Sequence, residues 1–182
     1  MSRYEVRPLR SDDFAALLEV EETVFGAAGE STLGPYYVRL VCDFFHDTCF
    51  ACWADHDGAK VIAGYVLCFV RGREAYCTTL AVHPAFQGSR VVIRLMQALS
   101  ARIVHDVDVC WFTVKPDNTA ARALHAMLGA HESEVRDDFY GKGDARIVSR
   151  LDRSSMERMA SRWCRLGLMD QAAPGVRTGM AA

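Results

Sequence analysis

Apolar residues along this chain follow two spacings, one typical of α-helices and one typical of β-strands. Recurrence every three or four residues predicts helices at residues 14–25, 36–45, 91–105, 119–128 and 153–168. Alternating or continuously apolar stretches predict strands at residues 4–8, 48–54, 61–70, 75–82, 109–114, 131–140 and 145–151. The resulting order predicts an α/β (α+β) fold, with a mixed, mainly antiparallel central sheet of about seven strands flanked by helices.

Turn and cap residues mark where several of these elements begin. Ser11 is expected to cap the first helix, and Pro35 opens the second. Gly58 is expected to supply a positive φ in the turn before the third strand. On the first helix, Glu21 is the polar exception at an otherwise apolar spacing. The apolar side of the second helix is expected to consist of Tyr37, Leu40, Val41 and Phe44.

The stretch from Thr79 to Val92 reads as an apolar strand that breaks into a tight turn and then a helix. Pro84 ends the strand, and residues 87–89 form the turn. The start of a helix leaves backbone N–H groups without partners, and these groups bind anions such as phosphate. The pattern therefore predicts an anion-binding turn before the helix at 91–105.

This stretch resembles motif A of the GNAT superfamily of N-acetyltransferases, in which Gln/Arg-x-x-Gly-x-Gly/Ala surrounds the pyrophosphate of acetyl-CoA. The signature here begins with Gln87 and Gly88, but Arg90 and Val92 replace both signature glycines. Side chains at these positions narrow the loop, because glycine lets the backbone approach a phosphate closely. Arg90 could compensate by pairing with a phosphate. The alternative is weakened or absent cofactor binding.

A second segment resembles the same superfamily, which carries Asn-x-x-Ala-x-x-Leu-Tyr-x-x-Leu-Gly-Phe at this point. The matching residues are Asn118, Ala121, Leu124, Leu128 and Gly129. His125 stands in place of the Tyr, and Ala130 in place of the final Phe. Two motifs in the right order are much stronger evidence than one strand-turn-helix unit, which many folds contain.

The resemblance covers residues 3–151, about five sixths of the chain. It implies a GNAT domain at 1–152, and the spacing and composition of residues 153–182 predict a C-terminal helix and a flexible tail after it. It also implies an enzyme that transfers an acetyl group from acetyl-CoA to a primary amine of a small molecule or peptide by direct attack. Two alternatives stay open: a catalytically degenerate GNAT-fold binding or scaffold protein, and a GNAT-fold acyltransferase in a biosynthetic pathway with another acyl donor.

By the same resemblance, the donor lies between the strand at 75–82 and the strand at 109–114. The backbone N–H of Leu80 or Val82 could then polarise the acetyl carbonyl. Asn118 would contact the pantetheine arm, or serve only as a helix cap. The residues expected to bind acetyl-CoA are Leu80, Ala81, Val82, Gln87, Gly88, Ser89, Arg90, Val91, Val92, Asn118 and Arg122.

The residues expected to take part in proton transfer are His125, Tyr76 and Glu74. His125 occupies the place of the family's acidic Tyr, and a protonated imidazole could donate to the departing thiolate; the alternative is a half-buried helix residue. Thr113 occupies the place of a general base but cannot accept a proton at neutral pH. Tyr76 is the expected water-positioning group, and Glu74 is either a base or a solvated turn residue.

The acceptor is expected to meet the first loop, the second helix and the last hairpin. The run from Arg136 to Tyr140 resembles an aromatic segment of ribosomal-protein and protein N-terminal acetyltransferases, in which aromatic side chains hold the peptide end. Residues expected to line the acceptor pocket are Tyr36, Tyr37, Phe139 and Tyr140. The 153–168 helix is expected either to pack back on the domain or to form a homodimer.

Composition narrows the partners and the compartment. Lys plus Arg total 21 against 23 Asp plus Glu, so the net charge of −2 gives no general attraction to nucleic acid or to an anionic membrane. No apolar run approaches the ~18 residues of a membrane span, and we expect a cytoplasmic protein. Seven scattered cysteines favour reduced core thiols over disulfides. No metal is expected, because the clustered Cys49 and Cys52 lie on one strand at a spacing that points them to opposite faces.

Overall fold

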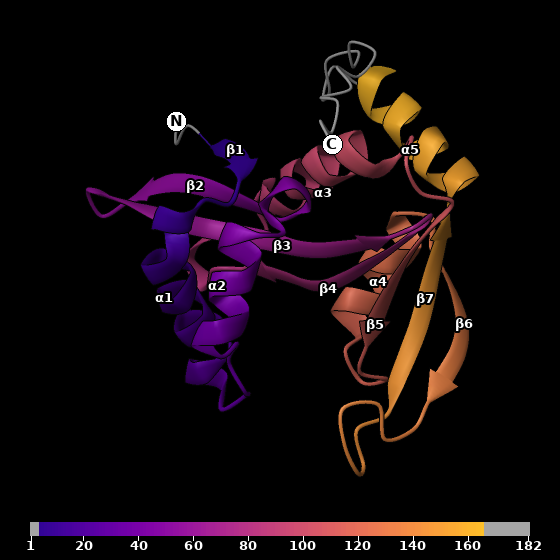
Figure 1. Cartoon of the computed structure of the whole chain (residues 1–182), viewed down its shortest axis with the longest axis horizontal. Coiled ribbons are helices and arrows are strands. Elements are labelled where there is room, and N and C mark those ends of the chain that lie inside the picture. The colour runs from indigo at the N-terminus through magenta and orange to yellow at the C-terminus, as the bar shows by residue number, and fades with distance from the viewer. Residues whose placement is uncertain (1–3, 166–182) are drawn as a thin grey trace, which may run out of the picture.

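The computed structural model describes residues 4–165 and contains one seven-stranded sheet with helices on both faces (Figure 1). The strands are β1 Glu5–Pro8, β2 Phe50–His56, β3 Ala59–Arg71, β4 Glu74–Val82, β5 Val109–Val114, β6 His131–Arg136 and β7 Arg146–Asp152. The α-helices are α1 Phe14–Val24, α2 Pro35–Asp43, α3 Val91–Ile103, α4 Thr119–Met127 and α5 Arg153–Arg165. Short 3₁₀ turns lie at Ser11–Asp13, Gly26–Ala28, His46–Thr48 and Pro84–Phe86. The predicted element order and the mixed, mainly antiparallel sheet are confirmed.

The sheet has the order β1-β2-β3-β4-β5-β7-β6, and β4–β5 is its parallel pair. These two strands pair from Glu74 opposite Val109 as far as Cys77 opposite Phe112, and then they separate (Figure 1). Thr78 is an extra residue in β4, because Leu67 of β3 pairs with Thr79 while the next β3 residue pairs with Cys77. A bulge bends and twists the strand that carries it. The bulge therefore lies at the point where β4 leaves β5.

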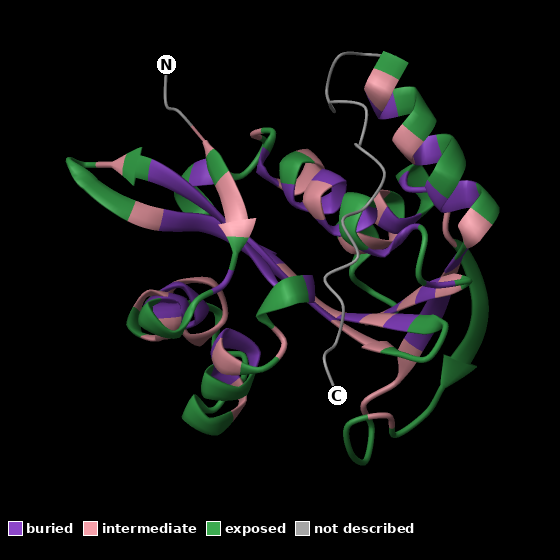
Figure 2. Cartoon of the chain, turned by 45° about the horizontal axis from the view of Figure 1, so that its top comes forward, coloured by how far each residue is buried: buried purple, intermediate pink, exposed green. Residues whose placement is uncertain are grey.

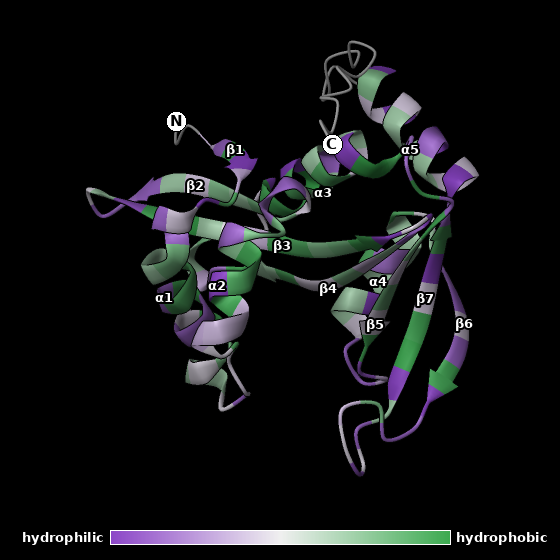
Figure 3. Ribbon diagram, in the orientation of Figure 1, coloured by the Kyte–Doolittle hydropathy of each residue, from purple (hydrophilic) through white to green (hydrophobic). Residues whose placement is uncertain are grey.

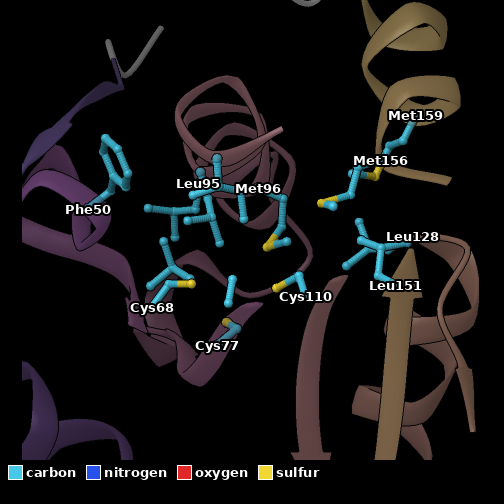
Figure 4. Packing of buried hydrophobic residues seen from close by; sticks show 14 of the residues in the cluster. Phe50, Cys68, Cys77, Leu95, Met96, Cys110, Leu128, Leu151, Met156 and Met159 are labelled. Carbon is cyan, nitrogen blue, oxygen red and sulfur yellow. The ribbon is translucent and has the colours of Figure 1, made fainter. Parts of the chain in front are cut away.

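Two hydrophobic clusters hold the layers together. One lies under α1 and α2 and includes Leu17, Val41 and Tyr65. The other lies under α3, α4 and α5, where Leu95 and Met96 pack over the cysteines of β3, β4 and β5 (Figure 4). The central strands of the sheet are buried and apolar, whereas the edge strand β6 is exposed and mostly polar (Figures 2 and 3).

The C-terminal helix α5 packs back on the domain. Met156 and Met159 are buried in the cluster that α3 helps to form (Figure 4), and Trp163 belongs to the same cluster. Arg153 at the start of α5 donates to the carbonyl of Val107 at 3.0 Å and pairs with Asp108 at 3.1 Å. No helix within residues 4–165 is long and apolar enough to cross a bilayer. The end of the predicted helix at 166–168 and the predicted flexible tail lie outside the described residues.

Two details of the predicted helices are wrong. Ser11 does not cap α1: its hydroxyl donates to Asp43, and the Asp13 carboxylate instead accepts from the backbone N–H of Arg10 at 2.8 Å. The second helix ends at Asp43, and its fully buried side consists of Val38, Val41 and Cys42, while Leu40 and Phe44 are exposed. Cys42 packs as a small hydrophobic residue, so the buried side of α2 includes Cys42 and not Leu40.

The turns behave largely as expected. Gly58 adopts a positive φ of 82°, as expected, and Asp57 before it has a positive φ of 51°. These two residues form the whole turn, because His56 of β2 already pairs with Ala59 of β3. Such a pair matches the twist of the flanking strands in a two-residue hairpin. The first strand of the last hairpin is shorter than predicted, since residues 137–145 form a loop between β6 and β7, and the second strand is shifted by one residue.

Candidate functional site

The gap between β4 and β5 exposes backbone groups of β4. His83 N–H donates to the carbonyl of Ala63 on β3 at 3.0 Å, and successive residues of a strand direct their N–H groups to opposite sides. The N–H groups of Val82 and Leu80 therefore point away from β3, toward the space that β5 has left. Both residues are half-buried, and Ala81 between them is buried. The position of these two donors agrees with the expectation from the sequence.

The turn before α3 retains the features of an anion site. Gly88 has a positive φ of 75°, a conformation that glycine adopts without strain. Arg90 has an ordinary φ of −80°, and Val92 lies in the first turn of α3, so neither substitution strains the backbone. Ser89 Oγ accepts from the N–H of Val91 at 3.3 Å. The following N–H groups at the helix start lack intrahelical partners, as in any helix of this length.

Two arginines near this turn differ in what they contact. Arg90 is exposed, and its side chain forms no hydrogen bond or ion pair within residues 4–165, while its backbone carbonyl accepts from the N–H of Arg94 at 3.0 Å. Arg122 on α4 donates to Glu132 of β6 at 2.7 Å and to the carbonyl of Pro116 at 3.0 Å. Arg90 is thus available to a phosphate at the start of α3, whereas the guanidinium of Arg122 is already paired. The N-terminal turn of α3, Gly88 and Arg90 together fit a pyrophosphate group.

Asn118 is the N-cap residue of α4, which is one of the two roles expected from the sequence. Its Oδ1 accepts from the N–H of Ala121 at 3.0 Å. Its contact with a pantetheine arm stays a prediction. Gly129, with a φ of 86°, ends the same helix as expected.

On the face of the sheet that α1 and α2 cover, opposite to α3 and α4, a cavity of about 910 Å³ opens beside the bulge of β4. It lies between the loop that follows α1, the middle of β4 and the loop before β7. Its walls are formed by Glu21, Phe25, Gly29, Glu30, Ser31, Thr32, Leu33, Tyr37, Tyr76, Thr78, Thr79, Lys115, Tyr140, Asp144 and Arg146. This cavity and the anion-binding turn are separated by the β4–β5 gap.

A chain of hydroxyl groups crosses the cavity wall. Tyr76 Oη lies 3.0 Å from Thr113 Oγ1 on β5 and 2.7 Å from Tyr140 Oη in the loop before β7. The Tyr76 ring stacks on Trp111 with the ring centroids 3.8 Å apart, which fixes its orientation. Burial raises the pKa of Tyr76 well above its ordinary value, so the hydroxyl stays protonated and can donate. Three residues far apart in sequence thus form one hydrogen-bonded row.

His125 lies on the other side of β5 from this row. Its ring is buried against Phe112 at a centroid distance of 4.8 Å, and Nδ1 is 3.1 Å from Ser149 Oγ on β7. Burial lowers the pKa of His125 below its ordinary value, although the charge of Glu132 opposes the shift. The resting imidazole is therefore neutral at pH 7, which makes it a weak proton donor. Its role as the acid stays a prediction.

The other residues expected at the site divide into two groups. Tyr37 and Tyr140 line the cavity, and the Tyr37 hydroxyl is 3.1 Å from Thr78 Oγ1. Glu74 does not join them, because it is exposed at the first residue of β4, three residues before the strands separate. Tyr36 is 95% exposed and does not line the cavity. Phe139 packs edge-on against Tyr140 and is also absent from the cavity wall.

Several cavity residues escaped the sequence reasoning. Lys115 and Asp144 lie in connecting segments, and Arg146 is the first residue of β7, where spacing carries no signal. Thr78 is the bulged residue of β4, and no pattern marked it. Glu21 did carry a signal, because it was the polar exception on the apolar face of the first helix.

Neither a metal site nor a thiol nucleophile is part of this arrangement. No group of three or more His, Cys, Asp or Glu side chains within residues 4–165 is close enough to hold a metal ion. Cys77 lies at the last paired residue of β4, but its side chain is buried in the core. Burial raises the pKa of its thiol well above the ordinary value, so the thiolate needed for nucleophilic attack is not formed near neutral pH.

Comparison with known proteins finds relatives that are acetyltransferases. A curated [ribosomal protein bS18]-alanine N-acetyltransferase of Haemophilus ducreyi is 29% identical over 84 residues, which cover 46% of this chain and 58% of that relative. The chain thus spans little more than half the length of the curated relative that it matches.

Solved structures share the fold at lower identity. The ribosomal-protein-S18-alanine N-acetyltransferase from Escherichia coli has a TM-score of 0.65 and 20% identity, covering 82% of this chain and 94% of that chain. A diaminobutyrate acetyltransferase from Paenibacillus lautus, in complex with L-2,4-diaminobutyric acid and coenzyme A, has a TM-score of 0.65 and 19% identity, covering 82% and 95%. These likenesses confirm the fold predicted from the sequence.

The family model described as the acetyltransferase (GNAT) family matches residues 13–130. This range includes the strand-turn-helix unit at 79–92, the capped helix after Asn118, and Glu21 and Tyr76 of the cavity. It makes up well over half of the chain. The chain therefore belongs to the acetyltransferase (GNAT) family.

Proposed function

We propose that the protein is an acetyl-CoA-dependent N-acetyltransferase that acts on a primary amine of a small molecule or peptide. One observation carries the proposal: the β4–β5 gap has an anion-binding helix start on one face and a cavity with a row of hydroxyl groups on the other. A thioester that crosses the gap would meet an amine that enters from the cavity. Membership of the family and the activities printed for the relatives support the same reaction.

The chain's own residues have three tasks in the donor half of the site. The N-terminal turn of α3, with Gly88 and Arg90, would hold the pyrophosphate. The exposed edge of β4 would pair with the pantetheine arm. The N–H of Leu80 or Val82 would donate to the carbonyl oxygen as negative charge develops on it, which is where such donors accelerate acyl transfer most. Acetyl-CoA supplies the activated acyl group.

The reaction forms a C–N bond and breaks a C–S bond, and a proton must leave the amine while the thiolate gains one. Tyr76 is held in place by Trp111 and Thr113, and it stays protonated, so it suits the donor role. Its bond to Tyr140 offers a path along which a proton can move between the gap and the cavity. We assign direct attack rather than a covalent enzyme intermediate, because the buried thiol of Cys77 is not activated.

Two finer expectations belong to this proposal. A cytoplasmic location is supported by the seven cysteines, of which six are buried as free thiols and Cys164 is half-buried. A homodimer through α5 would have to use the exposed side of that helix, because its apolar side packs on the domain. Both stay predictions.

Calorimetric titration with acetyl-CoA, followed by a mass-spectrometric screen of amines and peptide N-termini, tests the proposal. We expect binding at micromolar concentration and a mass increase of one acetyl group on at least one acceptor class. Absence of binding below millimolar concentration would contradict it and favour a binding or scaffold protein, for which the substituted turn at Arg90 and Val92 is the supporting observation. Tighter binding of a longer acyl-CoA would favour the biosynthetic alternative.

A further inference from the structure

Glu21 of α1 is a buried carboxylate in the wall of the cavity. Its side chain is 1% exposed, and Oε2 accepts from the backbone N–H of Leu33 at 2.8 Å. Oε1 is buried and has no hydrogen-bond partner within residues 4–165. Buried polar atoms almost always have a partner, because leaving one unpaired is costly. The free oxygen therefore marks a place for a donor that the described residues do not supply.

The other charges of the cavity wall are already paired with one another. Lys115 Nζ lies 3.5 Å from Glu30 Oε2. Arg146 forms two hydrogen bonds with Asp144, at 2.5 and 2.8 Å. Glu21 is thus the ionisable residue of the wall without an opposite charge beside it, and its ionised form gives the wall one excess negative charge. Such a cavity favours a cation over an anion or a neutral molecule.

The hydroxyl groups of the wall do not satisfy Glu21 either. Tyr37 is bonded to Thr78, and Tyr76 is bonded to Tyr140. The N–H of Leu33 occupies Oε2, and Glu21 belongs to the cavity wall, so Oε1 is the oxygen left for a donor that enters the cavity. Burial raises the pKa of Glu21, and a cation beside Oε1 would favour the charged form of the carboxylate.

We propose that Glu21 Oε1 binds a positively charged nitrogen of the acceptor, and that Glu21 selects ammonium-bearing acceptors. The role of the cavity as an acceptor site rests on the proposed function. Within that role, Glu21 is a specificity residue, and the acceptor class is an alkylammonium compound rather than a carboxylate or an uncharged alcohol.

Calorimetric titrations of the full chain without acetyl-CoA test this assignment. The probes are n-butylammonium chloride, 1-butanol and sodium butyrate, which share an alkyl chain and differ in charge. We expect n-butylammonium to bind about tenfold more tightly than 1-butanol, as a charge-assisted hydrogen bond predicts. Glu21→Gln should remove this preference, and Glu22→Gln, the same charge change at the exposed neighbour, should keep it.

Equal binding of n-butylammonium by the wild type and Glu21→Gln would overturn the proposal, and so would butyrate binding as tightly as n-butylammonium. A second measurement covers the case in which Glu21→Gln does not fold. In carboxyl ¹³C NMR of the wild type, n-butylammonium should lower the pKa of Glu21, and an unchanged pKa would contradict the contact. Neither measurement uses acetyl-CoA. Failure to bind acetyl-CoA would therefore refute the proposed function, whereas failure of n-butylammonium to contact Glu21 would refute only this inference.

Discussion

Tyr76 and Tyr140 lie with their hydroxyl oxygens 2.7 Å apart, although 64 residues separate them in the chain. The first belongs to β4, one residue before the last residue that pairs with β5, and the second to the loop before β7. The pair joins the β4–β5 gap to the cavity. It connects the place where the thioester would lie with the place where the amine would enter.

Tyr76→Phe should lower kcat about 10²-fold with a small change in acetyl-CoA affinity, because it removes a proton donor and leaves the ring stacked on Trp111. Tyr140→Phe should lower kcat less, since Tyr140 is the outer member of the pair. Steady-state kinetics with the best acceptor of the screen measure both. Tyr4→Phe, which loses a hydroxyl remote from the cavity, is the control. A Tyr76→Phe enzyme with the kcat of the control would exclude the donor role.

Arg90→Ala should weaken acetyl-CoA binding about fivefold and reduce its dependence on salt, because a free guanidinium at a helix start is lost. Arg122→Ala should change the affinity less than twofold, since Arg122 is held by Glu132. Calorimetry at two salt concentrations distinguishes the two, with Arg102→Ala at the far end of α3 as a further control. A larger loss for Arg122 than for Arg90 would contradict the assignment.

These arginines show where sequence reasoning succeeds and where it stops. The turn around Gly88 could be predicted because its strand, turn and helix are consecutive and have clear periodicity. The partner of Arg122 could not, because Glu132 lies on the next strand and the contact depends on how α4 and β6 meet. Spacing predicts which residues share a face of an element, and pairing between elements requires the fold.

The residues of the cavity also show how far the sequence alone predicts the site. The family resemblance pointed to the second helix and the last hairpin, and Tyr37 and Tyr140 from these two segments line the cavity. Their contact with an acceptor stays a prediction. Tyr36 does not line the cavity, because one position along α2 turns its side chain about 100° away from that of Tyr37, and the helical spacing had already placed only Tyr37 on the apolar side. Glu21 interrupted an apolar stripe, and only the structure reveals that it remains buried with a free oxygen.

The buried imidazole of His125 should make the protein less stable as the pH falls. The folded-state pKa lies below the ordinary value of 6.5 that applies to the unfolded chain, so the unfolded state binds the proton first. Stability is full above pH 6.5 and declines as the pH falls toward the folded-state pKa. Urea unfolding at pH 7 and pH 5 should show a smaller loss for His125→Gln than for the wild type. His131→Gln, at an exposed site, should lose as much as the wild type.

The packing of α5 bears on the expected boundary between residues 152 and 153. Met156 is 1% exposed and touches the core that α3 and β7 share, so Met156→Ala should lower the free energy of unfolding by about 2–5 kcal/mol. Met127→Ala, at a 60% exposed position of α4, should change it by less than about 0.5 kcal/mol. Urea denaturation measures both. A Met156→Ala protein as stable as the Met127→Ala control would mean that α5 is an appendage. The expected loss would make α5 part of the folding unit, so a chain ending at residue 152 would lack part of its own core.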